Sequence, residues 1–259
     1  MGGTKHVFLS DVHIGAFSPK QNHEIEADLI RLIDHCRLEG YRLYVLGDLF
    51  DYWMEYPEKG FVPELGKNVL DAFEAYNKMM DPALFITGNH DNWTYGHFED
   101  RGFDTESNFR LTDIENKRFL LMHGDGVEPE GLDFPRAAFH QFLRSEYFVR
   151  IYQKILPPKA GLATMKWFSS VTRKRNYMNP DPLNRQAEKI FNRKKIDFIM
   201  TGHDHIPRVE TFSGGIYINL GTFFKHRSVA IFEQGDINLQ VWHSESNKFL
   251  PFDIIKDGL

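Results

Sequence analysis

The chain has 259 residues, of which 26% are charged and 42% hydrophobic, a balance typical of a globular protein. Its formal net charge of -5 gives no general reason to expect a stable nucleic-acid complex. The single cysteine, Cys36, excludes an intramolecular disulfide and favours a reducing compartment. The sequence starts without a signal-peptide core, and no apolar run reaches the ~18 residues that span a bilayer. We therefore expect a cytoplasmic protein with one domain, residues 1–259.

Alternating strand and helix patterns predict an α/β fold. Residues 5–13 form the first expected strand, Ile25–Leu38 an amphipathic helix that stops at Gly40, and Tyr41–Leu46 the second strand. This β-α-β opening implies a parallel pair. The other expected elements are a helix over 63–80, a strand over 83–86, a loop with short helical pieces over 92–109, a hairpin over 109–123, a helix over 183–192, a strand over 196–200, and antiparallel strands over 215–220 and 228–242.

Five short apolar runs end in the same kind of polar sequence. The sequences that follow them are Asp11-Val12-His13, Gly47-Asp48, Gly88-Asn89-His90-Asp91, His123-Gly124-Asp125 and Gly202-His203-Asp204-His205. The carboxyl ends of strands in an open α/β sheet form the edge at which ligands bind. The recurrence of Asp, Asn and His at this position therefore predicts a site built from five strand ends.

The polar residues of these motifs form a set of candidate metal ligands. Its members are Asp11, His13, Asp48, Asn89, His123, His203 and His205. Oxygen and imidazole ligands without thiolates suit Mn, Fe, Zn, Ni or Co. Seven ligands are too many for one ion with an open position but are enough for two ions, and Asp48 is the central candidate for a bridging carboxylate. Two ions roughly 3.5–4 Å apart can hold a hydroxide and clamp the oxygens of a phosphoryl group.

His90 follows Asn89 on the same tight turn, so we expect it to face the site without binding a metal. A cationic imidazole there could stabilise developing charge and protonate a leaving oxygen. Asp91 could orient this imidazole, as carboxylates orient histidines in other enzymes. We expect Asp51, which comes shortly after Asp48, to support the site from behind or to cap a turn.

Residues 134–178 differ in composition from the rest of the chain, because aromatic and basic residues alternate there and acidic residues are nearly absent. We expect a helical cap insertion at about 130–180, broken into pieces by Pro157-Pro158 and Gly161. One interpretation is a set of ordinary helices with solvated basic faces. The other is a cap that offers apolar surface to an acyl chain or a membrane and basic groups to phosphate.

In this order, the motifs D-x-H, G-D-x-x-D, G-N-H-D, H-G-D and G-H-x-H resemble those of the calcineurin-like metallophosphoesterase family. The resemblance runs from about Asp11 to His205, and the downstream sequence 218–222 resembles the Asn-x-Gly-Ser/Thr turn of that family. It implies a four-layer α/β/β/α sandwich with His90 as the catalytic histidine. It also implies two metal sites: Asp11, His13, Asp48 and His205 at one, and Asp48, Asn89, His123 and His203 at the other.

A narrower resemblance, through residues 47–53, 123–126 and the basic-aromatic insertion, is to the UDP-2,3-diacylglucosamine hydrolases of lipid A synthesis. It implies cleavage of a pyrophosphate to UMP and a lipid monophosphate, usually with manganese, at the cytoplasmic face of the membrane. Many of those hydrolases have Arg where this chain has His90. The substrate contacts that this resemblance implies are Asn89, Ser169 or Ser170, Arg173, Lys174 and Arg175.

Three alternatives remain open from the sequence alone. A phosphodiesterase or nucleotide pyrophosphatase for a soluble substrate could use the same metal site. Such an enzyme would pack the cap aromatics into a closed core, whereas a lipid enzyme would line an open cleft with them. An inactive interaction module would have lost ligands or His90, yet all are present. A nuclease is the third alternative, because basic and aromatic residues also suit single strands.

Overall fold

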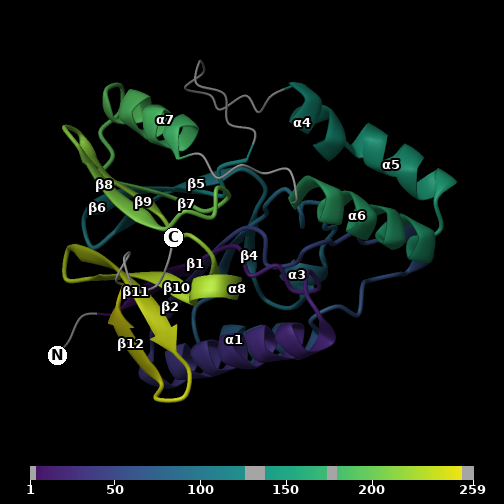
Figure 1. Ribbon diagram of the computed structural model, residues 1–259, viewed down its shortest axis with the longest axis horizontal. Coiled ribbons are helices and arrows are strands. Elements are labelled where there is room, and N and C mark those ends of the chain that lie inside the picture. Colours follow the sequence, from purple (N-terminus) through teal and green to yellow (C-terminus); the bar gives the residue numbers. More distant parts are fainter. Residues whose placement is uncertain (1–3, 126–137, 174–179, 253–259) are drawn as a thin grey trace.

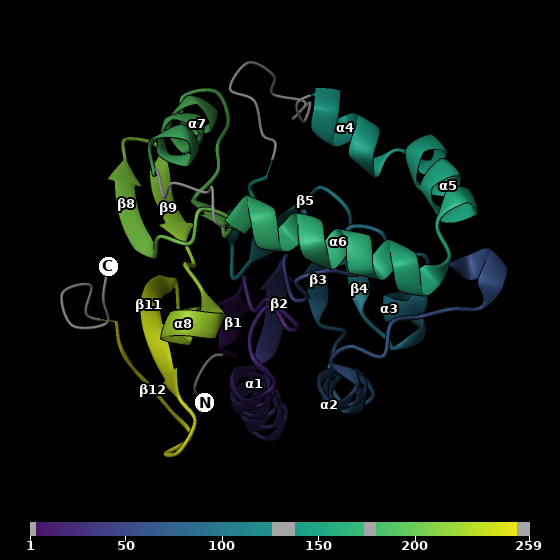
Figure 2. The same ribbon diagram turned by 45° about the vertical axis from the view of Figure 1, so that its right-hand side comes forward.

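The computed structural model describes residues 4–125, 138–173 and 180–252, with the backbone alone for 138–140 and 171–173. Two β-sheets stack face to face between layers of helices (Figures 1 and 2). The spatial order of the larger sheet is β12 (Lys248–Pro251), β11 (Asp236–His243), β10 (Ser228–Glu233), β1 (His6–Leu9), β2 (Arg42–Leu46), β3 (Leu84–Ile86) and β4 (Asp104–Glu106). The smaller sheet has the order β5 (Phe109–Ile114), β6 (Lys117–Met122), β7 (Phe198–Thr201), β9 (Gly215–Asn219) and β8 (Arg208–Phe212).

The helices cover the outer faces of the two sheets. Helices α1 (Pro19–Glu39) and α2 (Lys67–Asn77) pack on the larger sheet, and α7 (Asp181–Phe191) packs on the smaller one (Figure 2). Short helices α3 (His97–Asp100) and α8 (Phe223–His226) lie in connections. Three further helices form what we call the cap: α4 (Ala138–Arg144), α5 (Glu146–Ile155) and α6 (Pro158–Arg173). The predicted four-layer α/β/β/α sandwich is therefore confirmed.

The alternation of side chains along each strand explains the layers. Along β1, Val7 and Leu9 join the core beneath α1 and α2, whereas Phe8 joins the core between the two sheets. Successive side chains of a strand point to opposite faces, so a strand covered on both sides needs apolar residues at every position. Cys36, on the inner face of α1, is buried in the first of these cores.

Parallel strands at the centre of both sheets bring the predicted site together. Strands β1, β2 and β3 are parallel neighbours, and so are β6, β7 and β9. Their carboxyl ends therefore lie at the same edge of each sheet, and the two edges meet where the sheets stack.

Two helices differ in extent from their predictions. Helix α1 begins at Pro19 rather than at Ile25, because Ser18 and Gln21 form a capping box at its start. Its first turns are polar and solvent-facing, so apolar periodicity does not reveal them. Helix α2 begins at Lys67 rather than at 63, after Gly66 in a left-handed conformation, and it ends at Asn77.

Three short strands are absent from the sequence prediction: β4, β8 and β12. Each lies at an edge of its sheet and has polar residues that no apolar pattern marks. Gly161 also does not break the cap as predicted, since it lies inside α6. A Cβ atom at this position would collide with the Tyr56 hydroxyl, so the glycine allows α6 to approach the body of the protein.

Among the described residues, none of the helices combines the length and the apolar character required to cross a bilayer.

The core between the sheets contributes to folding stability through packed aromatic rings. Phe119 is fully buried there and stacks with Phe8 and Phe198 at ring centroid distances of 5.9 and 4.8 Å. We predict that Phe119→Ala lowers the free energy of unfolding by about 3–5 kcal/mol, because it leaves a cavity. Chemical denaturation measures this loss. Leu38→Ala, at a side chain 75% exposed on α1, is the control, and an equal loss in both variants would contradict the prediction.

Candidate metal centre

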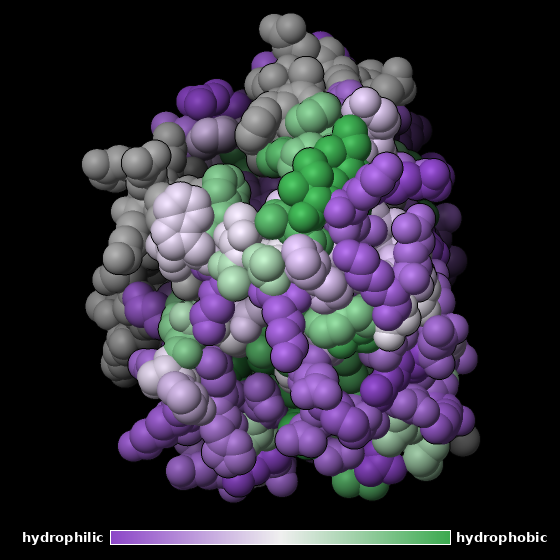
Figure 3. Space-filling model, turned by 90° about the vertical axis from the view of Figure 1, so that its right-hand side faces the viewer, coloured by the Kyte–Doolittle hydropathy of each residue, from purple (hydrophilic) through white to green (hydrophobic). Residues whose placement is uncertain are grey.

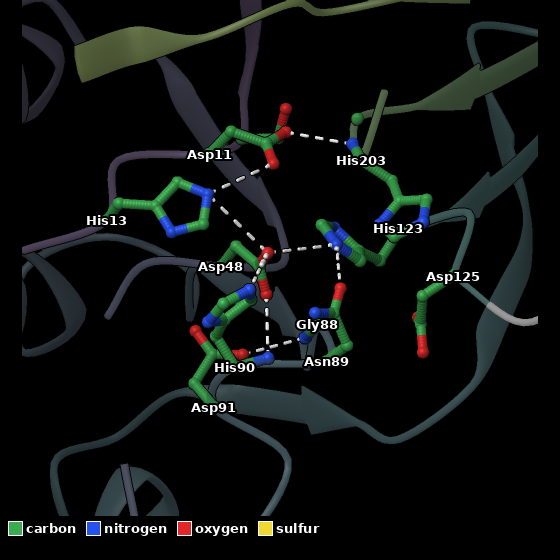
Figure 4. A network of polar contacts seen from close by, with 12 residues as sticks. Asp11, His13, Asp48, Gly88, Asn89, His90, Asp91, His123, Asp125 and His203 are labelled. Atoms are coloured by element: carbon green, nitrogen blue, oxygen red, sulfur yellow. Dashed lines mark hydrogen bonds and ion pairs between the residues drawn. The ribbon is translucent and has the colours of Figure 1, made fainter. Parts of the chain in front are cut away.

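Side chains from the ends of β1, β2, β3, β6 and β7 converge on one cluster (Figure 4). All seven candidate metal ligands are in it, although they are spread over nearly 200 residues of sequence. Among the described residues, three overlapping groups of Asp and His could hold an ion, and Asp48 belongs to two of these groups. The structure therefore brings together the residues that the strand-end motifs predict.

One half of the cluster is formed by Asp11, His13, Asp48 and His205. The Nε2 atoms of His13 and His205 are 3.2 Å apart. The Oδ1 atom of Asp11 lies 3.1 Å from Nε2 of His205 and 3.6 Å from Nε2 of His13. Oδ2 of Asp48 is also 3.6 Å from His13 Nε2. The donor atoms of Asp11, His13 and His205 thus lie close enough together to bind one cation, and Asp48 adjoins this group at His13.

The other half is formed by Asp48, Asn89, His123 and His203. Nε2 of His123 lies 3.3 Å from Oδ2 of Asp48 and 3.2 Å from Oδ1 of Asn89. The His203 ring lies against the His123 ring at a centroid distance of 5.1 Å, and the His203 amide donates to Asp11. Because one oxygen of Asp48 faces both halves, its carboxylate has the position that a bridge between two ions requires.

The buried carboxylates of the cluster need nearby positive charge to stabilise them. Asp11 and Asp48 are almost completely buried. Burial would raise the pKa of Asp48, but the imidazoles of His123 and His90 hold it well below its usual range. Burial would conversely lower the pKa values of His13 and His123, yet the neighbouring carboxylates raise both to about 10. Divalent cations would stabilise the same carboxylates, so the donor set fits two metal ions.

His203 has the opposite electrostatic setting. Burial, followed by the charge of the nearby His123, lowers the pKa of His203 to about 4. Its imidazole is therefore neutral at physiological pH, which is the state that binds a metal.

His90 lies at the edge of the cluster, where it forms one of the three groups of possible ligands with His13 and Asp48. Its Nε2 atom is 3.9 Å from Asp48, and its Nδ1 atom is 2.8 Å from the backbone carbonyl oxygen of Asp51. Its backbone amide donates to Asp48 Oδ1 at 3.0 Å. Burial lowers the pKa of the His90 imidazole. The carbonyl of Asp51 therefore fixes the ring, while Nε2 faces the centre.

Asp91 does not contact the His90 ring as expected. Its carboxylate instead accepts hydrogen bonds from three backbone amides, those of Gly88, Leu49 and Phe50, at 2.7, 2.7 and 3.3 Å. Burial, followed by the charge of Asp48, raises the pKa of Asp91 to about 7. Asp91 thus joins the turn after β3 to the turn after β2, and the orienting contact expected from Asp91 comes from Asp51.

The backbone around the cluster is held in uncommon conformations. Five candidate ligands have a positive φ between 50° and 73°: Asp11, His13, Asp48, His203 and His205. Residues other than glycine adopt this region at a cost and often do so at functional sites. Two glycines of the motifs also allow close packing, because a Cβ atom on Gly88 would meet Asp48 and one on Gly202 would meet Asp11.

The predicted substrate contacts have different positions. Ser169 is buried and donates to Asp51 Oδ1 at 2.9 Å, so it reaches the supporting carboxylate. Ser170 donates to the carbonyl oxygen of Trp167 in its own helix. For Arg173 the structure describes only the backbone, and Lys174 and Arg175 lie outside the described residues.

Sequence reasoning missed two residues that contact the centre. Phe224, in α8, packs edge-on against the rings of both His13 and His205. Arg144, in α4, donates to the carbonyl oxygen of Gly88 at 2.6 Å. Neither residue lies in a strand-end motif, and only the fold brings them to the cluster.

Comparison with known proteins agrees with this geometry. The family model described as Calcineurin-like phosphoesterase matches residues 4–207. The chain belongs to this family. A UDP-2,3-diacylglucosamine hydrolase from Aeromonas hydrophila is 27% identical over 246 residues, covering 90% of this chain and 97% of that protein. The protein of the same name from Proteus mirabilis is 23% identical over 248 residues, covering 94% of this chain and 93% of its own length.

Membership of the calcineurin-like phosphoesterase family makes the chain a hydrolase of phosphoester or phosphoanhydride bonds. Members of this family use a dimetal centre, and the convergent Asp and His groups are candidates for it.

Gly88 packs against Asp48 too closely to leave room for a side chain. A Cβ atom there would lie 2.6 Å from the Asp48 backbone nitrogen and would also collide with its carboxylate. We expect Gly88→Ala to weaken Mn²⁺ binding by about tenfold or more, because it displaces the central carboxylate. Titration calorimetry measures this change. Gly235→Ala, in a surface turn where a Cβ atom meets nothing within 4 Å, should keep wild-type affinity. Equal Mn²⁺ affinity of Gly88→Ala and Gly235→Ala would refute the steric argument.

Proposed function

We propose that the chain is a dimetal phosphohydrolase that cleaves the pyrophosphate of a nucleotide-linked glycolipid. The proposed reaction converts UDP-2,3-diacylglucosamine to UMP and a lipid monophosphate. The observation that carries this proposal is a complete set of metal ligands beside a cap that exposes large apolar side chains. The curated relatives support it, because their names give this substrate and the chain covers nearly their full length.

In this proposal each half of the cluster holds one ion. Asp11, His13, Asp48 and His205 bind one, and Asp48, Asn89, His123 and His203 bind the other. Manganese is the proposed metal, since it suits a set of oxygen and imidazole ligands; Fe, Zn, Ni or Co would suit it as well. Two such ions would supply an activated water and would offset the negative charge of the phosphate groups.

His90 is the proposed acid catalyst. The Asp51 carbonyl oxygen accepts a hydrogen bond from Nδ1, and the opposite nitrogen, Nε2, faces the centre. In the proposed step, the cationic form of the imidazole donates its Nε2 proton to a leaving oxygen. Asn89, beside it on the same turn, is a proposed contact to the substrate phosphate as well as a ligand. Asp91 is proposed to fix the shape of this turn, because its carboxylate accepts hydrogen bonds from three backbone amides.

The cap provides the proposed surface for the lipid. Several of its large apolar residues are exposed, among them Tyr147 at 72%, Ile155 at 71% and Trp167 at 65%. On the side of the molecule that Figure 3 draws, hydrophobic surface lies in the upper part, next to strongly polar surface. Other cap aromatics close onto the body, where Trp93 contacts Tyr152 and Phe148. We propose a cap insertion at about 130–180 in a single domain, with its exposed part available to acyl chains or to the cytoplasmic face of a membrane.

The substrate can be tested by manganese-supplemented hydrolysis of three compounds: UDP-2,3-diacylglucosamine, a UDP-sugar without acyl chains and a small aryl phosphodiester. We expect kcat/KM to be highest for the acylated compound, with UMP as a product, because only this compound uses the apolar cap. Equal or better turnover of the UDP-sugar or the diester would reject the lipid substrate. That result would favour a soluble-substrate phosphodiesterase or nucleotide pyrophosphatase with the same centre.

Substitutions at the centre should separate metal binding from proton transfer. We predict that Asp48→Ala abolishes turnover and weakens metal loading, because both halves of the cluster lose a ligand. His90→Ala should slow turnover by about 100-fold or more while metal content stays near the wild-type value. Metal analysis alongside steady-state kinetics checks both variants. Full activity in Asp48→Ala would end the dimetal model, and loss of metal in His90→Ala would make His90 a ligand.

A further inference from the structure

The cap reaches the metal centre through Arg144, the last residue of α4. Its guanidinium group donates to the Gly88 carbonyl oxygen at 2.6 Å and to that of Ser107 at 3.1 Å. It also forms a 3.0 Å ion pair with Asp125, whose side chain is completely buried, while the Arg144 side chain is only 13% exposed. The Gly88 carbonyl belongs to the peptide bond that leads directly into Asn89 and His90. Arg144 therefore holds the turn after β3 from the cap side.

A second contact comes from Ser169 in α6. Its buried hydroxyl donates to Asp51 Oδ1 at 2.9 Å. The same carboxylate oxygen lies 3.4 Å from Nδ1 of His13 and 3.9 Å from Nδ1 of His90. Ser169 thus fixes a carboxylate that faces two imidazoles of the centre, in the turn after β2.

Together, the two contacts hold the two turns that carry Asp48, Asn89 and His90. A largely buried arginine and a buried serine hydroxyl must find acceptors, and both find acceptors on these turns. Groups that orient metal ligands from behind commonly change metal affinity or activity by 10–100-fold when removed. A lid that served only to cover the substrate would not need such contacts.

We propose that Arg144 and Ser169 are positioning residues, through which the cap fixes the geometry of the metal centre. This inference rests on the proposed metal-dependent hydrolysis but not on the glycolipid substrate. The cap then has two separate tasks: its outer surface meets the substrate, and its inner contacts hold the two turns.

The test uses the full-length chain with Arg144→Gln, Arg144→Lys and Ser169→Ala. Two matched controls are Arg150→Gln, an exposed arginine paired with Glu146, and Thr164→Ala, whose hydroxyl donates to its own helix. Mn²⁺ affinity is measured by calorimetry. The values of kcat and KM are measured on UDP-2,3-diacylglucosamine and on a small aryl phosphodiester that is too short to use the cap surface. Melting temperatures identify any variant that fails to fold.

We expect Arg144→Gln and Ser169→Ala to weaken Mn²⁺ binding or lower kcat by about tenfold, with KM unchanged. Arg144→Lys should recover part of the loss, because it keeps the charge beside Asp125 but not the forked donors. The controls should match the wild type. Ser169→Ala removes one hydroxyl group only, so it tests the proposal even if Arg144→Gln does not fold.

Mn²⁺ affinity and kcat within twofold of the controls in both Ser169→Ala and Arg144→Gln, or in Ser169→Ala alone if Arg144→Gln does not fold, would overturn the proposal. A change confined to KM for the acylated substrate would overturn it too, because these residues would then be substrate contacts. If the wild type hydrolyses the aryl diester but not the acylated nucleotide, only the glycolipid proposal fails. If the wild type neither binds Mn²⁺ nor hydrolyses the diester, the proposed metal-dependent function itself fails.

Discussion

The structure depends on one electrostatic constraint: the carboxylates of Asp11 and Asp48 are buried with little access to water. An isolated buried charge is unfavourable by several kcal/mol, so cations must accompany these carboxylates in the folded protein. The imidazoles of His13, His123 and His205 lie within 3.6 Å of them, and the calcineurin-like fold supplies them from three different strand ends. This convergence requires two stacked sheets whose parallel strands end at a common edge, which is why the fold and the site cannot be separated.

The same constraint explains the backbone of the motifs. The ligands must turn sharply out of their strands, and five of them adopt a positive φ to do so. Glycine precedes Asp48, Asn89 and His203, and at Gly88 and Gly202 a larger residue would occupy the space of a carboxylate. The motif glycines are therefore needed for the packing of charge as much as for the turn itself. Strain of this kind persists where the surrounding contacts fix the conformation. Here the hydrogen bonds from three backbone amides to the Asp91 carboxylate do so.

The sequence was most informative where local pattern and burial agree. Continuous apolar runs identify β1, β2, β3, β6 and β7, and the polar residues after them identify the centre. Edge strands such as β12 were missed, because their pairing depends on a neighbour rather than on their own composition. The partners of Asp91 and Arg144 were missed for a similar reason. A carboxylate or guanidinium that binds backbone groups leaves no side-chain pattern in the sequence, so its role depends on which turns the fold brings near it.

Metal chemistry and substrate choice have separate origins in this chain. The strand ends determine which donors meet, and this arrangement would serve any phosphate ester or anhydride of suitable shape. The substrate must instead be selected by groups outside the strand ends, and the cap helices supply several large exposed apolar residues. The cap is nevertheless bonded to the turns that carry the ligands, through Arg144 and Ser169. A change in the cap can therefore alter the metal centre even when the substrate never touches the cap. Kinetics on a single substrate would not separate this change in the centre from a change in substrate binding by the cap. Metal affinity separates them, because it depends on the ligands and their supports but not on the cap surface that we propose for the substrate.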